Sequence, residues 1–148
     1  MKNNDYPTWL VPLDTALQLK GIGFDEPTLF HYYENDFDVT IETNSYYDEG
    51  EAQGYLHFYI SAFKEENFNR DKKCTSLPTW TDVFDWFRAR GYKITFKDIN
   101  IGTQCAFYHL DIKEGHTFSH FAKKYEKARE GLVMKLIEVH KEFGNNIK

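Results

Sequence analysis

Histidines and cysteines are the side chains with which this 148-residue chain could do chemistry. His116 and His120 lie four residues apart, the spacing of two metal ligands on one helix face. A zinc site needs three or four ligands, and Thr117 occupies the position at which a zinc-protease helix has its glutamate. We therefore interpret the pair as surface or helix-capping histidines, and we predict no metal and no cofactor.

A cysteine nucleophile would need a histidine close in space. Cys105 and His109 would share one strand face, but four residues of strand separate them by about 13 Å. His31 or His57 could approach from another strand, although a semi-buried thiol is the simpler interpretation. Cys74 and Cys105 lack the spacing of metal ligands, so we predict free thiols in a reducing compartment.

Neither the acids nor the glycines complete a catalytic motif. Adjacent carboxylates such as Asp25-Glu26 and Glu65-Glu66 are typical of solvated loops. The segment Gly21-Ile22-Gly23 lacks the third glycine of a dinucleotide-binding loop and follows an expected helix rather than a strand. The sequence therefore predicts no catalytic residues.

Composition indicates an ordinary globular protein with an unusual surplus of aromatic residues, which reach 18% of the chain. The net charge of -5 argues against a nucleic-acid binder, which normally carries a clustered basic surface. No stretch provides the roughly 18 apolar residues that begin to span a membrane. Met1 to Trp9 also lacks the apolar core of a signal peptide, so we expect a cytoplasmic protein with no membrane partner.

Spacing patterns predict the elements that position these side chains. Helical spacing predicts helices over Pro12 to Lys20, Trp80 to Arg90 and Tyr125 to Phe143, and the last could begin as early as Thr117. We expect Thr79 to cap the second helix, with Asp82 completing a capping box and Gly91 ending the helix. Alternation predicts strands over Thr28 to Tyr33, Phe37 to Thr43, Tyr55 to Phe63, Tyr92 to Lys97 and Cys105 to Ile112. Glu65 to Ser76 has no period and is expected to be a loop.

The order α-β-β-β-α-β-β-α predicts an α+β fold. Clean alternation is typical of antiparallel sheets with one face on the core and the other in water. We therefore expect a single compact domain over residues 1–148, with three helices mainly on one face of a twisted antiparallel sheet of about five strands, in two layers. In the last strand, Ala106, Tyr108, Leu110 and Ile112 are expected to face the helices, with His109 opposite.

The sheet face away from the helices is the candidate binding surface. The expected alternation places there the side chains of Tyr55, His57, Tyr59, Lys93, Thr95, Lys97 and His109. Rings beside lysines can stack a base and neutralise a phosphate, and exposed tyrosines also favour protein interfaces. The alternative is an ordinary solvated sheet surface, because tyrosine and threonine suit strands in any case.

Leu77 to Arg88 reads LPTWTDVFDWFR. This segment resembles the recurring LPTYQQAFDWFREK pattern of small proteins from Bacteroidales-type bacteria and their phages. Val11 to Glu26 and Tyr125 to Glu130 are similar to the same group. The resemblance implies a phage or prophage context, and it transfers no catalytic residues.

Three functions follow as hypotheses. The first is a non-enzymatic phage or mobile-element accessory protein that binds a host protein, or a second copy of itself, through the aromatic sheet face in the host cytoplasm. The alternative is a protein that binds or sequesters a small nucleotide-like signal. An enzyme comes third, because it would need a histidine within hydrogen-bond reach of Cys105 or of a carboxylate inside a cleft.

Overall fold

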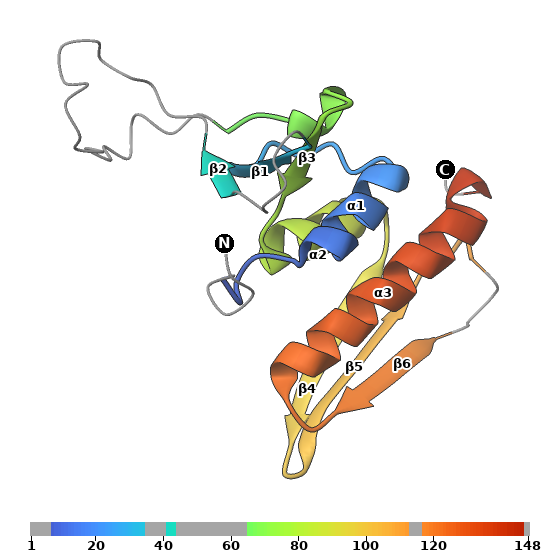
Figure 1. Ribbon diagram of the computed structural model, residues 1–148. Helices are drawn as coiled ribbons and strands as arrows, with labels where there is room; N and C mark the ends of the chain where they lie inside the picture. The colour runs from blue at the N-terminus through green and yellow to red at the C-terminus, as the bar shows by residue number, and fades with distance from the viewer. Residues whose placement is uncertain (1–6, 35–40, 44–64, 113–116, 147–148) are drawn as a thin grey trace, which may run out of the picture. The chain divides into compact units, whose positions relative to one another are not determined.

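The computed structural model describes residues 7–34, 41–43, 65–112 and 117–146. These residues form three α-helices and antiparallel strands, so the expected α+β class is confirmed. The described strands form two three-stranded sheets rather than one continuous sheet. The chain divides into two compact units, Met1–Pro78 and Thr79–Lys148 (Figure 1). The single domain expected over residues 1–148 stays a prediction.

The N-terminal unit combines one helix with one sheet. Its helix α1 spans Leu13–Gly21, and its sheet has the order β2-β1-β3, with β1 at Phe30–Tyr33, β2 at Ile41–Thr43 and β3 at Cys74–Leu77. A short 3-10 helix, η4 at Phe68–Arg70, precedes β3. The prediction that Glu65 to Ser76 is entirely loop is therefore wrong. All four residues of β3 are buried and pair with β1, a long-range contact that no local pattern reveals.

Lys20 fixes the turn that leads into β3. Its ammonium, near the end of α1, donates to the backbone carbonyls of Asp71 at 2.8 Å and Lys72 at 3.3 Å, and to that of Cys74. The Asp71 carbonyl also accepts from the Cys74 N–H at 3.3 Å, and the charged donor adds stronger hydrogen bonds than a neutral one would. The end of α1 and the start of β3 are thereby tied together.

Two helices and a meander make up the C-terminal unit. Helix α2 spans Trp80–Ala89, the strands β4, β5 and β6 span Lys93–Ile99, Gly102–Tyr108 and Phe118–Ala122, and helix α3 spans Tyr125–Phe143. The sheet order is β4-β5-β6. Helix α3 packs along β5 and β6, and α2 packs against β4 and α3 (Figure 1). Both helices of this unit therefore cover the same face of its sheet.

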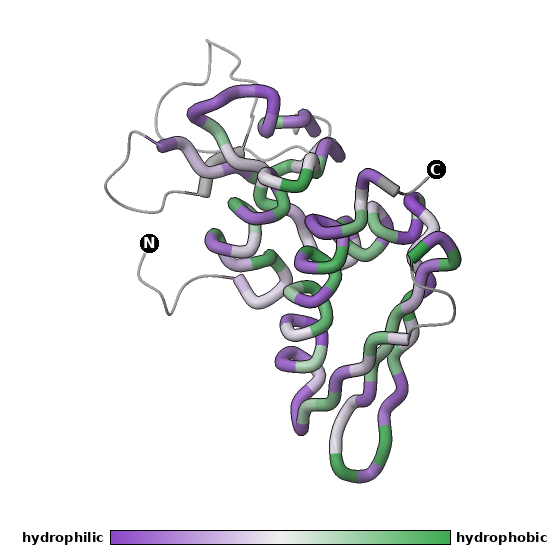
Figure 2. The backbone as a smooth tube through the Cα atoms, turned by 90° about the vertical axis from the view of Figure 1, so that its right-hand side faces the viewer, coloured by the Kyte–Doolittle hydropathy of each residue, from purple (hydrophilic) through white to green (hydrophobic). Residues whose placement is uncertain are grey.

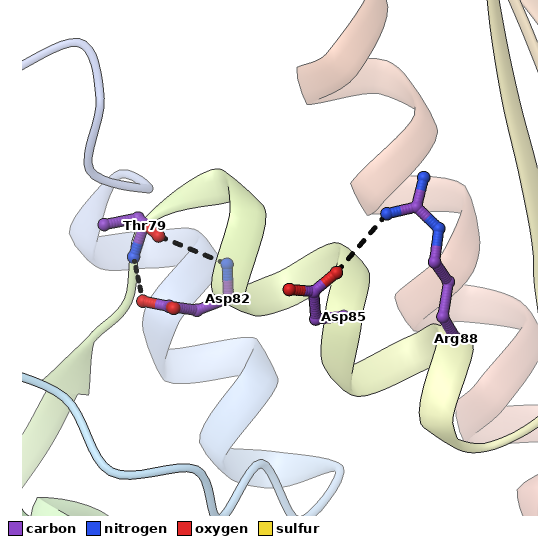
Figure 3. A network of polar contacts seen from close by, with 4 residues as sticks. All are labelled: Thr79, Asp82, Asp85 and Arg88. Carbon is purple, nitrogen blue, oxygen red and sulfur yellow. Dashed lines mark hydrogen bonds and ion pairs between the residues drawn. The ribbon is translucent and has the colours of Figure 1, made fainter.

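The start of α2 has the capping box that the sequence predicted. The Thr79 hydroxyl accepts from the Asp82 N–H at 3.2 Å, and the Asp82 carboxylate accepts from the Thr79 N–H at 3.0 Å (Figure 3). One turn further on, Arg88 forms an exposed ion pair with Asp85 at 3.4 Å. The helix ends before Gly91, whose φ of 91° lies in the left-handed region that glycine favours.

Strand β6 corrects the expected start of the last helix. Phe118, Phe121 and Ala122 fit helical spacing, and they predicted a helix that begins as early as Thr117. This segment instead pairs with β5, and α3 begins at Tyr125. A stretch this short fits both the helical and the strand spacing of apolar residues, so the hydrogen bonds to β5 decide its conformation.

Candidate functional site

The face of the β4-β5-β6 sheet turned away from α2 and α3 is called the open face here. The strand register arranges it in rows across the three strands: Lys93 pairs with Tyr108, Thr95 is followed by Ala106 and then Ser119, and Lys97 is followed by Gln104 and then Phe121. Successive rows are two residues apart along each strand, which is about 7 Å. The two rows that combine a lysine with a ring therefore lie about 14 Å apart, with small side chains between them.

Burial confirms which side of the sheet is open. Thr103, Cys105 and Phe107 are 3%, 1% and 1% exposed, because they face the helices. On the other side, Tyr108 is 40% exposed and Phe121 is 42% exposed. Two aromatic rings on the open face are thus accessible to a partner.

The open face is positively charged. Its described strand residues include two lysines and no carboxylate, although the chain as a whole has a net charge of -5. Asp98 belongs to the helix-facing set, where it pairs with Thr103 and its Oδ1 accepts the Thr103 hydroxyl at 2.7 Å. Charge complementarity therefore favours an anionic partner for this face.

The predicted site residues have different outcomes. Lys93 and Lys97 are both exposed on the open face, in the first and third rows. Tyr55, His57 and Tyr59 lie outside the described residues, so their position and role stay predictions.

His109 does not lie on the open face, and this part of the prediction is wrong. Its side chain is 6% exposed. Its Nδ1 accepts from the Asp111 N–H at 3.0 Å, so the other ring nitrogen, Nε2, donates to the Arg90 carbonyl at 2.7 Å. The physical reason is that β5 ends at Tyr108, so strand alternation does not continue into the residues that follow.

The two sides of β5 are also the reverse of the prediction. Phe107 faces the helices and pairs with Ile94 on β4, whereas Tyr108 lies on the open face. Leu110, which was expected inside, is 78% exposed. Both alternating sets in β5 mix apolar and polar residues, with Cys105 and Phe107 in one and Ala106 and Tyr108 in the other, so hydrophobicity alone could not choose between them. The hydroxyl of Tyr108 could have indicated the correct orientation. Of two neighbouring residues, a tyrosine and a phenylalanine, the tyrosine is the better candidate for the solvent-exposed side of the sheet.

Tyr92 and His140 form a polar pair inside a cluster of rings. The Tyr92 hydroxyl lies 2.9 Å from Nδ1 of His140, and the rings of Phe87 and His109 pack against Tyr92 at 5.3 Å and 4.8 Å between centroids. Burial raises the pKa of Tyr92. Burial first, and then the nearby Arg90 and His109, lower the pKa of His140. Near neutral pH both groups are therefore neutral, and one hydrogen bond joins the hydroxyl to the imidazole.

We expect His140 to make the stability of the protein fall as the pH drops below about 6.5. Its pKa lies below 6.5 in the folded chain, so the unfolded chain takes up the proton first and acid favours unfolding. Urea unfolding between about pH 8 and pH 5 should show this loss, and His140→Gln should flatten the profile. An unchanged pH profile in the variant would assign the acid sensitivity to other groups.

Cys105 has the environment of a structural thiol. Its single S–H proton has two acceptors within reach, the backbone carbonyls of His120 at 3.3 Å and Ala128 at 3.5 Å from Sγ. Burial raises the pKa of the thiol, whereas a nucleophilic cysteine needs a lowered one. His120 is the cross-strand partner of Cys105, a pairing that depends on β6 being a strand.

The remaining features do not identify a cofactor site. His116 lies outside the described residues, and no group of three or more His, Cys, Asp or Glu side chains that could hold a metal occurs within the described ranges. No helix in those ranges is long and apolar enough to cross a membrane. Comparisons with protein-family models, curated proteins and solved structures give no match to this chain.

Proposed function

We propose that this chain is a non-enzymatic accessory protein of phage or mobile-element type, which binds an acidic surface of a host protein through the open face. The supporting observation is the combination of two lysines, two accessible rings and no carboxylate among the described strand residues of that face. Aromatic rings supply contact area with little entropy loss, and lysines steer an acidic partner into register. The phage context is supported only by the resemblance of Leu77 to Arg88.

Charge makes a second copy of the chain a less favourable partner. Two open faces packed against each other would bring Lys93 and Lys97 of both copies together, with no carboxylate from the described strand residues to compensate. Like charges placed together across an interface cost several kcal/mol. We therefore favour a different protein over self-association.

Photo-crosslinking in bacterial host cells tests this proposal. Benzoylphenylalanine introduced at Thr95, in the middle row of the open face, should give a discrete protein adduct. The same amino acid at Glu138, which is exposed on α3, is the matched control and should give none.

Charge reversal makes the crosslinking test specific. Lys93→Glu combined with Lys97→Glu should remove the Thr95 adduct, because the altered face would repel an acidic partner. Equal adducts at Thr95 and Glu138, or an adduct that persists after charge reversal, would contradict the proposed binding mode.

A nucleotide-like small molecule is the second candidate partner. The observation that favours it is the direct pairing of Lys93 with Tyr108. Side chains directly opposite each other lie about 5 Å apart at Cβ, so the ring could stack on a base while the ammonium meets a phosphate. A thermal-shift panel of mono- and cyclic nucleotides should then show stabilisation, about 2.7 kcal/mol at a hundred times Kd. The shift should vanish in Tyr108→Ala, and no shift across the panel would remove this candidate.

A further inference from the structure

The end of the β4-β5 hairpin exposes apolar side chains that the fold does not require. Ile99 pairs with Gly102, and the two-residue turn Asn100-Ile101 joins the strands. Ile99 is 37% exposed and Ile101 is 71% exposed. Turns of this length normally use Asn, Asp or Gly, so the isoleucine side chain is not needed to form the turn. Figure 2 shows the hydrophobic colour at the projecting end of this hairpin.

The segment that links β6 to α3 lies against this turn. A Cβ built on Gly102 would overlap the Ala122 carbonyl oxygen and would lie 2.9 Å from both the Phe121 ring and the Lys123 Cα. Phe121 is 42% exposed, and Lys123 and Lys124 are exposed. We call Ile99, Ile101, Phe121, Lys123 and Lys124 together the hairpin end.

Basic residues predominate around the hairpin end. Lys97 and Lys127 extend the basic set on either side, on β4 and on the first turn of α3. The nearby acids are Asp98, whose carboxylate accepts the Thr103 hydroxyl, Glu126, and Glu130, which pairs with Lys127 at 3.4 Å. The region is therefore positively charged in a chain whose net charge is -5.

We propose that the hairpin end inserts into an anionic lipid surface, with Ile99 and Ile101 entering the apolar layer and Lys123 and Lys124 contacting lipid phosphates. The hairpin extends beyond the first turn of α3 (Figure 1), so its apolar residues form a projection rather than a groove. A lipid layer accepts a projection directly, whereas a protein partner would have to provide a matching pocket. Apolar insertion combined with adjacent lysines is the usual basis of attachment to the membrane interface.

Flotation of the full chain with lipid vesicles tests the insertion. Vesicles made of equal parts phosphatidylcholine and phosphatidylglycerol should bind the protein at low ionic strength, and vesicles of phosphatidylcholine alone should bind it more weakly. Ile101→Asp should lower the partition coefficient by about tenfold or more. Lys123→Gln combined with Lys124→Gln should lower it by about thirtyfold.

Leu110 provides the matched control. It is 78% exposed and lies beyond the opposite end of β5, so Leu110→Asp should leave the partition coefficient unchanged. Because Ile101 and Leu110 are both exposed, both variants should retain the wild-type circular dichroism spectrum.

Three results would overturn the proposal. The first is no binding to the anionic vesicles, and the second is binding that Ile101→Asp leaves intact, which indicates surface adsorption without insertion. The third is a concentration-dependent dimer that Ile101→Asp abolishes, since it would assign the hairpin end to a second copy of the chain. Lys97 and Phe121 contribute to both surfaces, but the variants used here change neither residue, so Thr95 crosslinking tests the open face separately.

Discussion

Gly102→Ala should lower the free energy of unfolding of the C-terminal unit by about 2–4 kcal/mol. The φ of Gly102 is 156°, a backbone conformation that residues with a Cβ rarely adopt. A Cβ at this position would also overlap the backbone carbonyl oxygen of Ala122. That carbonyl belongs to β6 and cannot move without disturbing the pairing of β5 with β6. Any backbone shift that makes room for the new methyl group would therefore also lower stability.

Gly21→Ala is the control for this substitution. Gly21 is the last residue of α1, and no atom lies within 4 Å of a Cβ built there. Alanine should therefore be neutral or stabilise by up to about 1 kcal/mol. Urea unfolding followed by tryptophan fluorescence suits both variants, since Trp80 and Trp86 report on the C-terminal unit and Trp9 on the N-terminal unit. A Gly102→Ala variant as stable as the wild type would show that the β5-β6 pairing described above is wrong.

Phe107→Ala and Tyr108→Ala should have very different effects although the residues are neighbours on β5. Phe107 is 1% exposed and its ring stacks on Phe118 at 4.9 Å between centroids, so its loss should cost about 3–5 kcal/mol. Tyr108 is 40% exposed, and its loss should cost less than about 1 kcal/mol. The same urea unfolding measurement compares the two.

This pair of variants also tests the basis of the proposed function. The open face exists only if β5 turns Tyr108 away from the helices. If Tyr108→Ala destabilises the protein as much as Phe107→Ala, the ring is covered and the proposed binding surface fails. If Tyr108→Ala leaves stability unchanged but abolishes the Thr95 adduct, the ring acts in binding.

Local signals predicted α2 well because its boundaries depend on neighbours in sequence. Thr79 and Asp82 form the expected capping box, and Gly91 has the expected positive φ. Its apolar residues at helical spacing, Trp80, Val83, Phe84 and Phe87, are buried. Each of these features involves residues within a few positions of one another, so the local sequence is enough to predict the bounds and the buried face of the helix.

The open face was only partly predictable because its composition depends on pairing between strands. Lys93 and Lys97 were found since β4 alternates clearly. Tyr108 was assigned to the wrong side because the two alternating sets of residues in β5 are similar in hydrophobicity. Phe121 was assigned to a helix, and only the pairing of β6 with β5 makes it a strand residue on the open face.

The contacts of Lys20 have a consequence for the ionic requirements of the N-terminal unit. Loops whose carbonyl oxygens converge are often held by a bound calcium ion, and here an ammonium group of the same chain takes that role at residues 71–74. A tethered cation cannot be diluted away or removed by a chelator. The turn before β3 should therefore remain ordered in EDTA, independently of the divalent ions in the surrounding solution.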